Sequence, residues 1–179
     1  MKRQIRSSVF ETNSSSTHSI AIPKNCNIAN RMRFYVGEFG WAFEEVDAAD
    51  YFYTAIHATS ENMAEFKKKM ERFKQILKNH DIEATFEDAH CNERHGWLSH
   101  DGYIDHGFEL SGFVNELLND EDKLLRFLSG GLVFTGNDNQ DSMGFTERNR
   151  EFIYDWDYMH NIRNEYYMSN HEEYEWYDK

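Results

Sequence analysis

The sequence is poor in cysteine, in proline and in long apolar runs. Two cysteines, Cys26 and Cys91, cannot form a disulfide framework, which fits a reducing compartment. A single proline, Pro23, and 10 glycines argue against long disordered linkers. No run approaches the roughly 18 apolar residues of a membrane-spanning helix, and the opening MKRQIRSS lacks the apolar segment of a secretory signal. We therefore expect a cytoplasmic protein that does not use a membrane, with one domain plus an appendage in its 179 residues.

Basic residues are also scarce, and the charge is unevenly distributed. The formal net charge is -13. Residues 1–36 hold six basic groups against one acidic group, residues 37–145 hold 9 against 22, and residues 146–179 hold 4 against 9. Such an acidic surface repels nucleic acid over most of its area and attracts a basic protein, including one that binds nucleic acid. The simpler explanation of the charge is solubility.

Two motifs that mark common enzyme classes are missing. The chain has no Gly-x-Ser-x-Gly nucleophile elbow and no glycine-rich loop of the kind that binds nucleotide phosphates. We therefore expect no cofactor, and an enzyme is the less favoured of the two function classes considered below.

Alternation of apolar and polar residues predicts four strands. They lie near residues 17–22, 32–36, 83–87 and 131–135. We expect an α+β domain over residues 1–145, in which these strands form one small, mostly antiparallel sheet backed by helices.

Apolar residues at three- and four-residue intervals predict the helices. Asp47 is expected to cap a helix up to residue 59, and Ser60 is expected to open a longer helix that ends near residues 79–81. Two more helices follow Phe108 and Asp120. The longer helix carries lysines that are expected to be solvated, namely Lys67, Lys68, Lys69, Lys74 and Lys78.

The most polar stretch of the chain is residues 9–19, VFETNSSSTHS. Its side chains either bond the backbone in a turn network or form part of a site, since a buried polar group without a partner costs about 1–3 kcal/mol. In a catalytic site, a serine such as Ser15 would be the nucleophile, His18 the base and Asp105 the group that orients the base. Glu38, on a turn between glycines, and His106 complete this candidate catalytic set.

Side chains able to bind a metal are dense between residues 90 and 106. Only Cys91 and His95 have the spacing of a close ligand pair, and zinc sites usually add a second such pair. A polar loop with scattered histidines is the simpler interpretation, so we expect no metal. Cys91 and His95 are the candidate ligands if one binds.

Residues 146–179 combine carboxylates with aromatic residues. Their apolar positions recur at helical spacing, which predicts a helical acidic appendage that packs on the domain or extends from it. Tyrosine and tryptophan supply anchoring area at interfaces and carboxylates pair with Arg and Lys, so this appendage is a candidate surface for a basic protein. The candidate contact residues are Glu151, Asp155, Trp156, Asp157, Glu165, Glu172, Glu173, Glu175 and Trp176.

Three separated motifs stand out: residues 9–19, residues 37–41 (GEFGW), and residues 103–106 (YIDH) with residues 135–139 (TGNDN). Together they resemble a family of uncharacterised proteins from phages and mobile elements. The resemblance covers most of residues 6–140 and leaves out the acidic appendage. It implies a phage protein that works in the cytoplasm of an infected bacterial host, and it implies no reaction.

Two function classes follow from this charge and this setting. Small acidic phage proteins often look like inhibitors of host defence, among them the anti-CRISPR proteins that block the nucleic-acid channel of Cas9. The first expectation is such an inhibitor, which binds Cas9 with or without guide RNA through acidic side chains. The alternative is a small phage hydrolase in which the basic residues 1–36 hold a phosphate-bearing substrate beside the candidate catalytic set.

Overall fold

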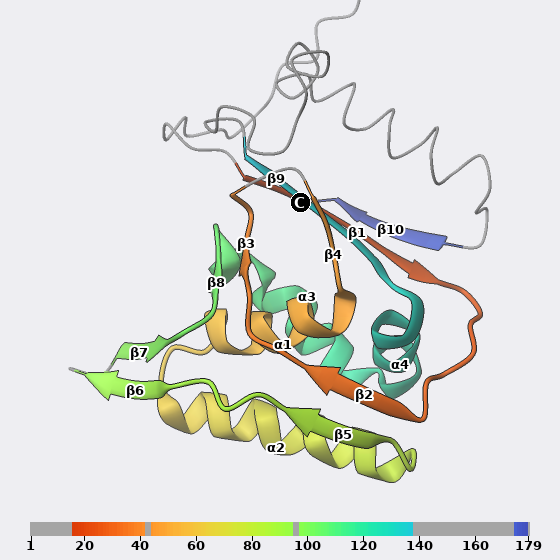
Figure 1. Ribbon diagram of the computed structural model, residues 1–179, viewed down its shortest axis with the longest axis horizontal. Coiled ribbons are helices and arrows are strands. Elements are labelled where there is room, and N and C mark those ends of the chain that lie inside the picture. The colour runs from red at the N-terminus through yellow and green to blue at the C-terminus, as the bar shows by residue number, and fades with distance from the viewer. Residues whose placement is uncertain (1–15, 42–43, 95–96, 138–173, 179) are drawn as a thin grey trace, which may run out of the picture.

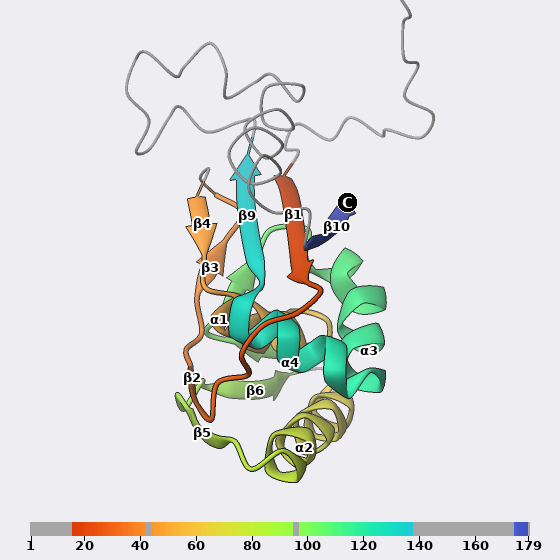
Figure 2. The ribbon, with the colours of Figure 1, turned by 90° about the vertical axis from the view of Figure 1, so that its right-hand side faces the viewer.

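The computed structural model describes residues 16–41, 44–94, 97–137 and 174–178, which form an α+β fold, as the sequence predicts. Figures 1 and 2 show a four-stranded sheet with α1, α3 and α4 against one face and α2 farthest from the sheet. The elements are β1 (Ser16–Pro23), β2 (Arg31–Phe34), β3 (Glu38–Phe39), β4 (Glu44–Val46), α1 (Ala48–Ala58), α2 (Met63–Asn79), β5 (Glu83–Phe86), β6 (Cys91–Arg94), β7 (Trp97–His100), β8 (Tyr103–Ile104), the 3-10 helix η1 (Gly107–Leu110), α3 (Ser111–Asn119), α4 (Glu121–Gly130), β9 (Leu132–Asn137) and β10 (Tyr174–Asp178).

The four-stranded sheet is antiparallel and has the order β10-β1-β9-β4. In the β1–β9 pair, His18 lies opposite Thr135. β10 pairs with the other side of β1, where Trp176 lies opposite Ala21. Residues 174–178 therefore form a strand where the sequence predicted a helix, because β1 supplies backbone partners that a local apolar pattern cannot reveal. The rest of the predicted appendage, residues 146–173, lies outside the described residues.

Two of the four predicted strands do not belong to this sheet. β2 and β5 pair with each other in parallel, from Arg31 opposite Glu83 to Phe34 opposite Phe86. A second parallel pair joins β3 to β8, and β6 and β7 form an antiparallel hairpin. The expectation of one sheet with all four strands is wrong, because pairing depends on where α1 and α2 return the chain and strand periodicity does not encode that path.

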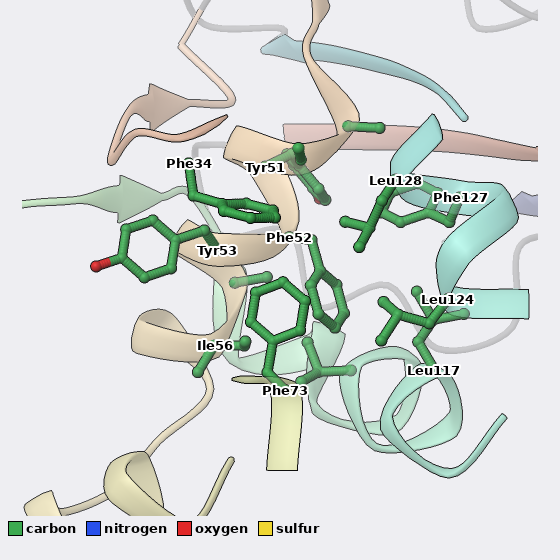
Figure 3. Close-up of a cluster of buried hydrophobic side chains, with 14 of the residues drawn as sticks. Phe34, Tyr51, Phe52, Tyr53, Ile56, Phe73, Leu117, Leu124, Phe127 and Leu128 are labelled. Carbon is green, nitrogen blue, oxygen red and sulfur yellow. The ribbon is translucent and has the colours of Figure 1, made fainter. Parts of the chain in front are cut away.

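α1 lies at the centre of the core. The Asp47 carboxylate accepts hydrogen bonds from the backbone N–H groups of Ala49 and Asp50 at 2.8 and 3.1 Å, so the predicted cap is confirmed. Side chains on every face of α1 are buried, which requires neighbours all round the helix. Figure 3 shows Phe52 of α1 beside Phe73 of α2, and their ring centroids lie 5.2 Å apart.

α2 begins after Asn62 and not at Ser60. The Asn62 side-chain oxygen accepts a hydrogen bond from the backbone N–H of Glu65 at 3.0 Å. The Ser60 hydroxyl instead donates to the carbonyl of Ile56 at 2.6 Å. The cap therefore lies two residues later than the sequence suggests, because the Ser60 hydroxyl bonds the last turn of α1.

Lys69 is the exception among the lysines of α2. The other four are exposed as predicted: Lys67, Lys68, Lys74 and Lys78. Lys69 is buried, where its Nζ donates to the carbonyl of Thr59 at 2.7 Å and pairs with Glu65 at 2.8 Å. These partners offset the loss of hydration, so Lys69 joins α2 to the end of α1 and does not belong to the solvated face.

α3 and α4 meet at Asp120, whose carboxylate accepts a hydrogen bond from the backbone N–H of Lys123 at 3.0 Å. α4 ends at Gly130, as the sequence predicts. Among the residues that the structure describes, no helix is both long and apolar enough to cross a membrane.

Candidate functional site

Three segments that are far apart in the sequence meet at Gly40, in the turn after β3. Gly40 has a φ of +97°, a conformation that residues with a side chain rarely adopt. A Cβ atom at this position would lie 2.9 Å from Cβ of Asp105 and 3.4 Å from Cε1 of His18. His18, Gly40 and Asp105 come from the three separated motifs of the sequence. The fold therefore brings these motifs to one point of contact.

His18 is buried beneath Gly40. Its Nε2 lies 2.8 Å from the backbone carbonyl oxygen of Asp105, and its Nδ1 lies 3.0 Å from the Tyr51 hydroxyl. A carbonyl oxygen can only accept, so Nε2 carries the proton and Nδ1 accepts the hydrogen bond that Tyr51 donates. Burial lowers the pKa of His18 and raises the pKa of Tyr51, which keeps both side chains neutral near pH 7.

Asp105 holds His18 through this backbone carbonyl. One carboxylate oxygen of Asp105 accepts a hydrogen bond from the Tyr103 hydroxyl at 3.0 Å, and its N–H donates to the carbonyl of Phe39 at 2.9 Å. In the catalytic alternative, Asp105 would orient His18. In the structure the two residues lie together, and the contact runs through the backbone carbonyl of Asp105. The hydrogen bond therefore holds the imidazole in one tautomer through a neutral carbonyl and not through a carboxylate as in a catalytic triad, although, against the larger effect of burial, the nearby Asp105 charge raises the pKa of His18.

An exposed group of side chains adjoins this buried contact. We call it the aromatic corner and define it as Glu38, Trp41 and Tyr103. The rings of Trp41 and Tyr103 stack with centroids 5.0 Å apart and planes 16° apart, although 39% and 41% of the two residues remain exposed. Glu38 lies opposite Tyr103 in the β3–β8 pair and is also exposed, so both side chains stand on the same face of that pair.

A hollow of about 390 Å³ lies beside the aromatic corner. Tyr103, His106 and Phe108 line it, and Phe108 is 70% exposed. His106 has a left-handed backbone with a φ of 54°, and its Nδ1 lies 3.7 Å from a carboxylate oxygen of Glu109. The hollow thus offers an imidazole and aromatic rings to a molecule at the surface.

The candidate catalytic set is only partly brought together. Asp105 and His106 line the hollow, whereas His18 lies buried behind Gly40 and Glu38 belongs to the exposed aromatic corner. Ser15 lies outside the described residues. Of the nine candidate contact residues of the appendage, only Glu175 and Trp176 are in a described element, the strand β10.

Of the two candidate metal ligands, the structure describes only Cys91. Cys91 lies on β6 with its side chain half-buried, and His95 lies outside the described residues. Within residues 16–41, 44–94, 97–137 and 174–178, no three His, Cys, Asp or Glu side chains are already grouped as a metal site.

Sequence reasoning missed two features. The first is the contact between Trp41 and Tyr103, which joins residues from different motifs. The only signal for it in the sequence is the position of Trp41 directly after a glycine turn. The second is His57, to which the sequence analysis gave no role; it lies in α1, is 1% exposed, and neither of its ring nitrogens has a hydrogen-bond partner.

Comparisons of the chain with protein families, with curated proteins and with solved structures find no match.

Proposed function

We propose that this protein is an inhibitor that binds a basic, nucleic-acid-binding surface of a host defence nuclease. The observation that carries the proposal is the aromatic corner: an exposed Trp41–Tyr103 stack beside Glu38, in a chain with a net charge of -13. Tryptophan and tyrosine are the residues that most often anchor protein interfaces, and the face of an aromatic ring attracts the guanidinium of arginine.

The build of the corner also supports a binding role. A stack of two large rings that is already formed loses little side-chain freedom on binding, so more of the contact energy appears as affinity. The contact of Gly40 with Asp105 fixes the turn that carries Trp41, and the Tyr103 hydroxyl is tied to Asp105 at 3.0 Å. The buried His18 then has a positioning role beneath the binding surface.

The proposed partner is an RNA-guided nuclease of the Cas9 type. Its heteroduplex channel and the arginines that read the PAM form extended positive surfaces, which acidic side chains can occupy in place of phosphates. Such an inhibitor leaves the nuclease chemically unchanged and acts in a stoichiometric complex.

Mass photometry of the full chain with Cas9 and guide RNA at low salt tests the proposal. We expect a complex at micromolar concentration, and we expect Trp41→Ala and Glu38→Lys to weaken it about tenfold or more. Glu71→Lys makes the same charge change on the exposed side of α2 and should alter the affinity less than about threefold. Absence of a complex rules out this target. A complex that both corner variants leave intact rules out the aromatic corner as the contact.

The second candidate function is a hydrolase for a phosphate-bearing substrate. The specific observation in its favour is the hollow, which Asp105 and His106 line. A general acid or base contributes about 10²–10⁴-fold to a rate, so His106→Ala should remove most hydrolysis of a chromogenic phosphate ester by such an enzyme. An inhibitor that works through the aromatic corner should keep its affinity for the nuclease in the same variant.

A further inference from the structure

The outer edge of β5 is open. On the inner edge, the backbone N–H of Glu83 donates to the carbonyl of Asn30 at 2.9 Å, and the N–H of Glu87 donates to the carbonyl of Phe34 at 2.9 Å. Successive residues of a strand direct their backbone groups to opposite edges, so those of Ala84 point away from β2. In the described part of the chain, no strand pairs with this outer edge. An unpaired edge is a template for a strand of another molecule.

A hollow of about 590 Å³ lies between β5 and α2, and we call it the edge groove. Its apolar lining consists of Leu77, Ile82, Ala84 and Phe86. Leu77 and Ile82 are buried, whereas the two residues of β5 remain partly exposed beside the open edge. Figures 1 and 2 show β5 and α2 side by side and well away from β3 and β8, which flank the aromatic corner. The edge groove is therefore a separate surface.

Two exposed lysines of α2 line the groove, one at each end of its apolar lining. The Nζ of Lys74 lies 5.1 Å from the centroid of the Phe86 ring, at the end of β5. Lys78 lies at the other end, where the N–H of Ile82 donates to the carbonyl of Leu77 at 2.9 Å and joins α2 to the start of β5. Both ammonium groups thus flank an apolar floor.

The charge around the groove favours an acidic ligand. α2 carries six basic and two acidic side chains, in a chain whose net charge is -13. Among the residues that the structure describes, neither Lys74 nor Lys78 has a carboxylate partner. Asp81 and Glu83 also line the groove, and Glu83 is already in an ion pair with β2 at 2.7 Å. Lysines beside an open edge disfavour pairing with a neutral or basic strand, so an acidic strand is the one that fits.

We propose that the edge groove binds an extended acidic segment of another protein, which adds to β5 as a further strand. The open edge supplies backbone hydrogen bonds, which give affinity in this mode of recognition, and the side-chain contacts give specificity. An aliphatic side chain contacts Leu77 and Ile82. An Asp or Glu two residues away on either side meets Lys78 or Lys74, because alternate side chains of a strand stand on one face.

A second copy of this chain is the wrong occupant. Pairing of two β5 edges would bring the basic α2 of both copies together, and like charges that face each other are destabilising. The proposal also does not depend on the proposed function, since the aromatic corner takes no part in the edge groove.

Fluorescence anisotropy of a labelled peptide with the sequence EEVVVEE tests the groove on the full chain. One face of this peptide, when extended, presents Glu, Val and Glu in turn. At low salt we expect saturable one-to-one binding with a Kd below about 1 mM, and weaker binding at high salt. The charge-reversed peptide KKVVVKK should not bind. Absence of saturable binding by EEVVVEE, or equal binding of both peptides, overturns the proposal.

Paired substitutions on α2 locate the contact. The double variant Lys74→Glu, Lys78→Glu should weaken binding of EEVVVEE at least tenfold. The matched control is Lys67→Glu, Lys68→Glu, which makes the same charge change at two exposed positions of the same helix that do not line the groove. This control should alter the Kd less than about threefold. Equal losses in the two double variants would assign the binding to net charge and overturn the proposed groove.

N-methylation of the peptide tests strand addition and leaves the protein unmodified. Only alternate residues of an added strand direct their N–H groups toward β5. Of two peptides, one methylated at the odd positions and one at the even positions, one should therefore lose binding at least tenfold and the other should keep it within about threefold. Equal affinities of the two methylated peptides overturn strand addition. Sedimentation of the full chain as a dimer that the peptide dissociates would show that a second copy occupies the edge, which also overturns the proposal.

Discussion

At the scale of single residues, Gly40 determines whether the three motifs can meet. Gly40→Ala is expected to lower the free energy of unfolding by about 2–4 kcal/mol, because a side chain at this φ is strained and its Cβ would press on Asp105. Urea unfolding measures the change. The control is Gly112→Ala in α3, where a new Cβ meets nothing within 4 Å and the stability should rise by about 0.5–1 kcal/mol. Equal stability of Gly40→Ala and the unmodified chain would contradict the strain argument.

His57 should make the protein sensitive to acid. Burial lowers the pKa of His57 to about 4, whereas a histidine in an unfolded chain has a pKa near 6.5. Between these values the unfolded state binds more protons. The free energy of unfolding should therefore fall as the pH falls from about 6.5 to 4, by about 3 kcal/mol for this one group.

His100 and Asp101 are the titratable groups that act on His57, and they act in opposite directions: His100 lowers its pKa and Asp101 raises it. Urea unfolding at several pH values measures the slope. His57→Phe should reduce the loss of stability between pH 6.5 and pH 4. An unchanged slope in that variant would show that other groups cause the acid sensitivity.

At the scale of elements, α2 shows how far local sequence signals reach. Its apolar rhythm located the helix, and most of its lysines are solvated as the pattern predicts. The cap and Lys69 differ, because the Ser60 hydroxyl and the Lys69 ammonium find partners at the end of α1. A polar side chain takes the partner that the tertiary structure offers, and a pattern within one helix contains no information about it.

Asn62 is therefore the residue to test at the start of α2. Asn62→Ala should lower the free energy of unfolding by about 1 kcal/mol, since it leaves the Glu65 N–H without its 3.0 Å hydrogen bond. Asn62→Asp keeps an acceptor at the cap and adds a charge that the helix dipole favours, so its stability should match or exceed that of the unmodified chain. Thermal unfolding of the two variants separates these outcomes, and an equal loss in both would assign the effect to something other than the cap.

At the scale of the whole molecule, charge is the dominant property. The net charge is -13 on a chain of 21.4 kDa, so the acidic side chains repel one another in the compact folded state. At 0.1 M, salt screens the repulsion between exposed charges that are more than about 10 Å apart. The melting temperature should therefore rise by a few degrees between about 0.02 and 0.3 M sodium chloride. A melting temperature that falls with salt would show that ion pairs such as Arg72–Glu121 outweigh the repulsion.

The sequence by itself determined the α+β class, the helices near residues 47–59 and 60–79, and the existence of the strands now called β1, β2, β5 and β9. Apolar residues recur about every 3.6 positions in a helix and every 2 positions in a strand, and such a pattern involves only residues that are near one another in the chain. It can therefore be recognised in a single sequence. Only the tertiary structure decided that β2 pairs with β5, that Gly40 meets His18 and Asp105, and that His57 faces His100. Each of these contacts joins residues separated by other elements, and its existence depends on how those elements pack around α1.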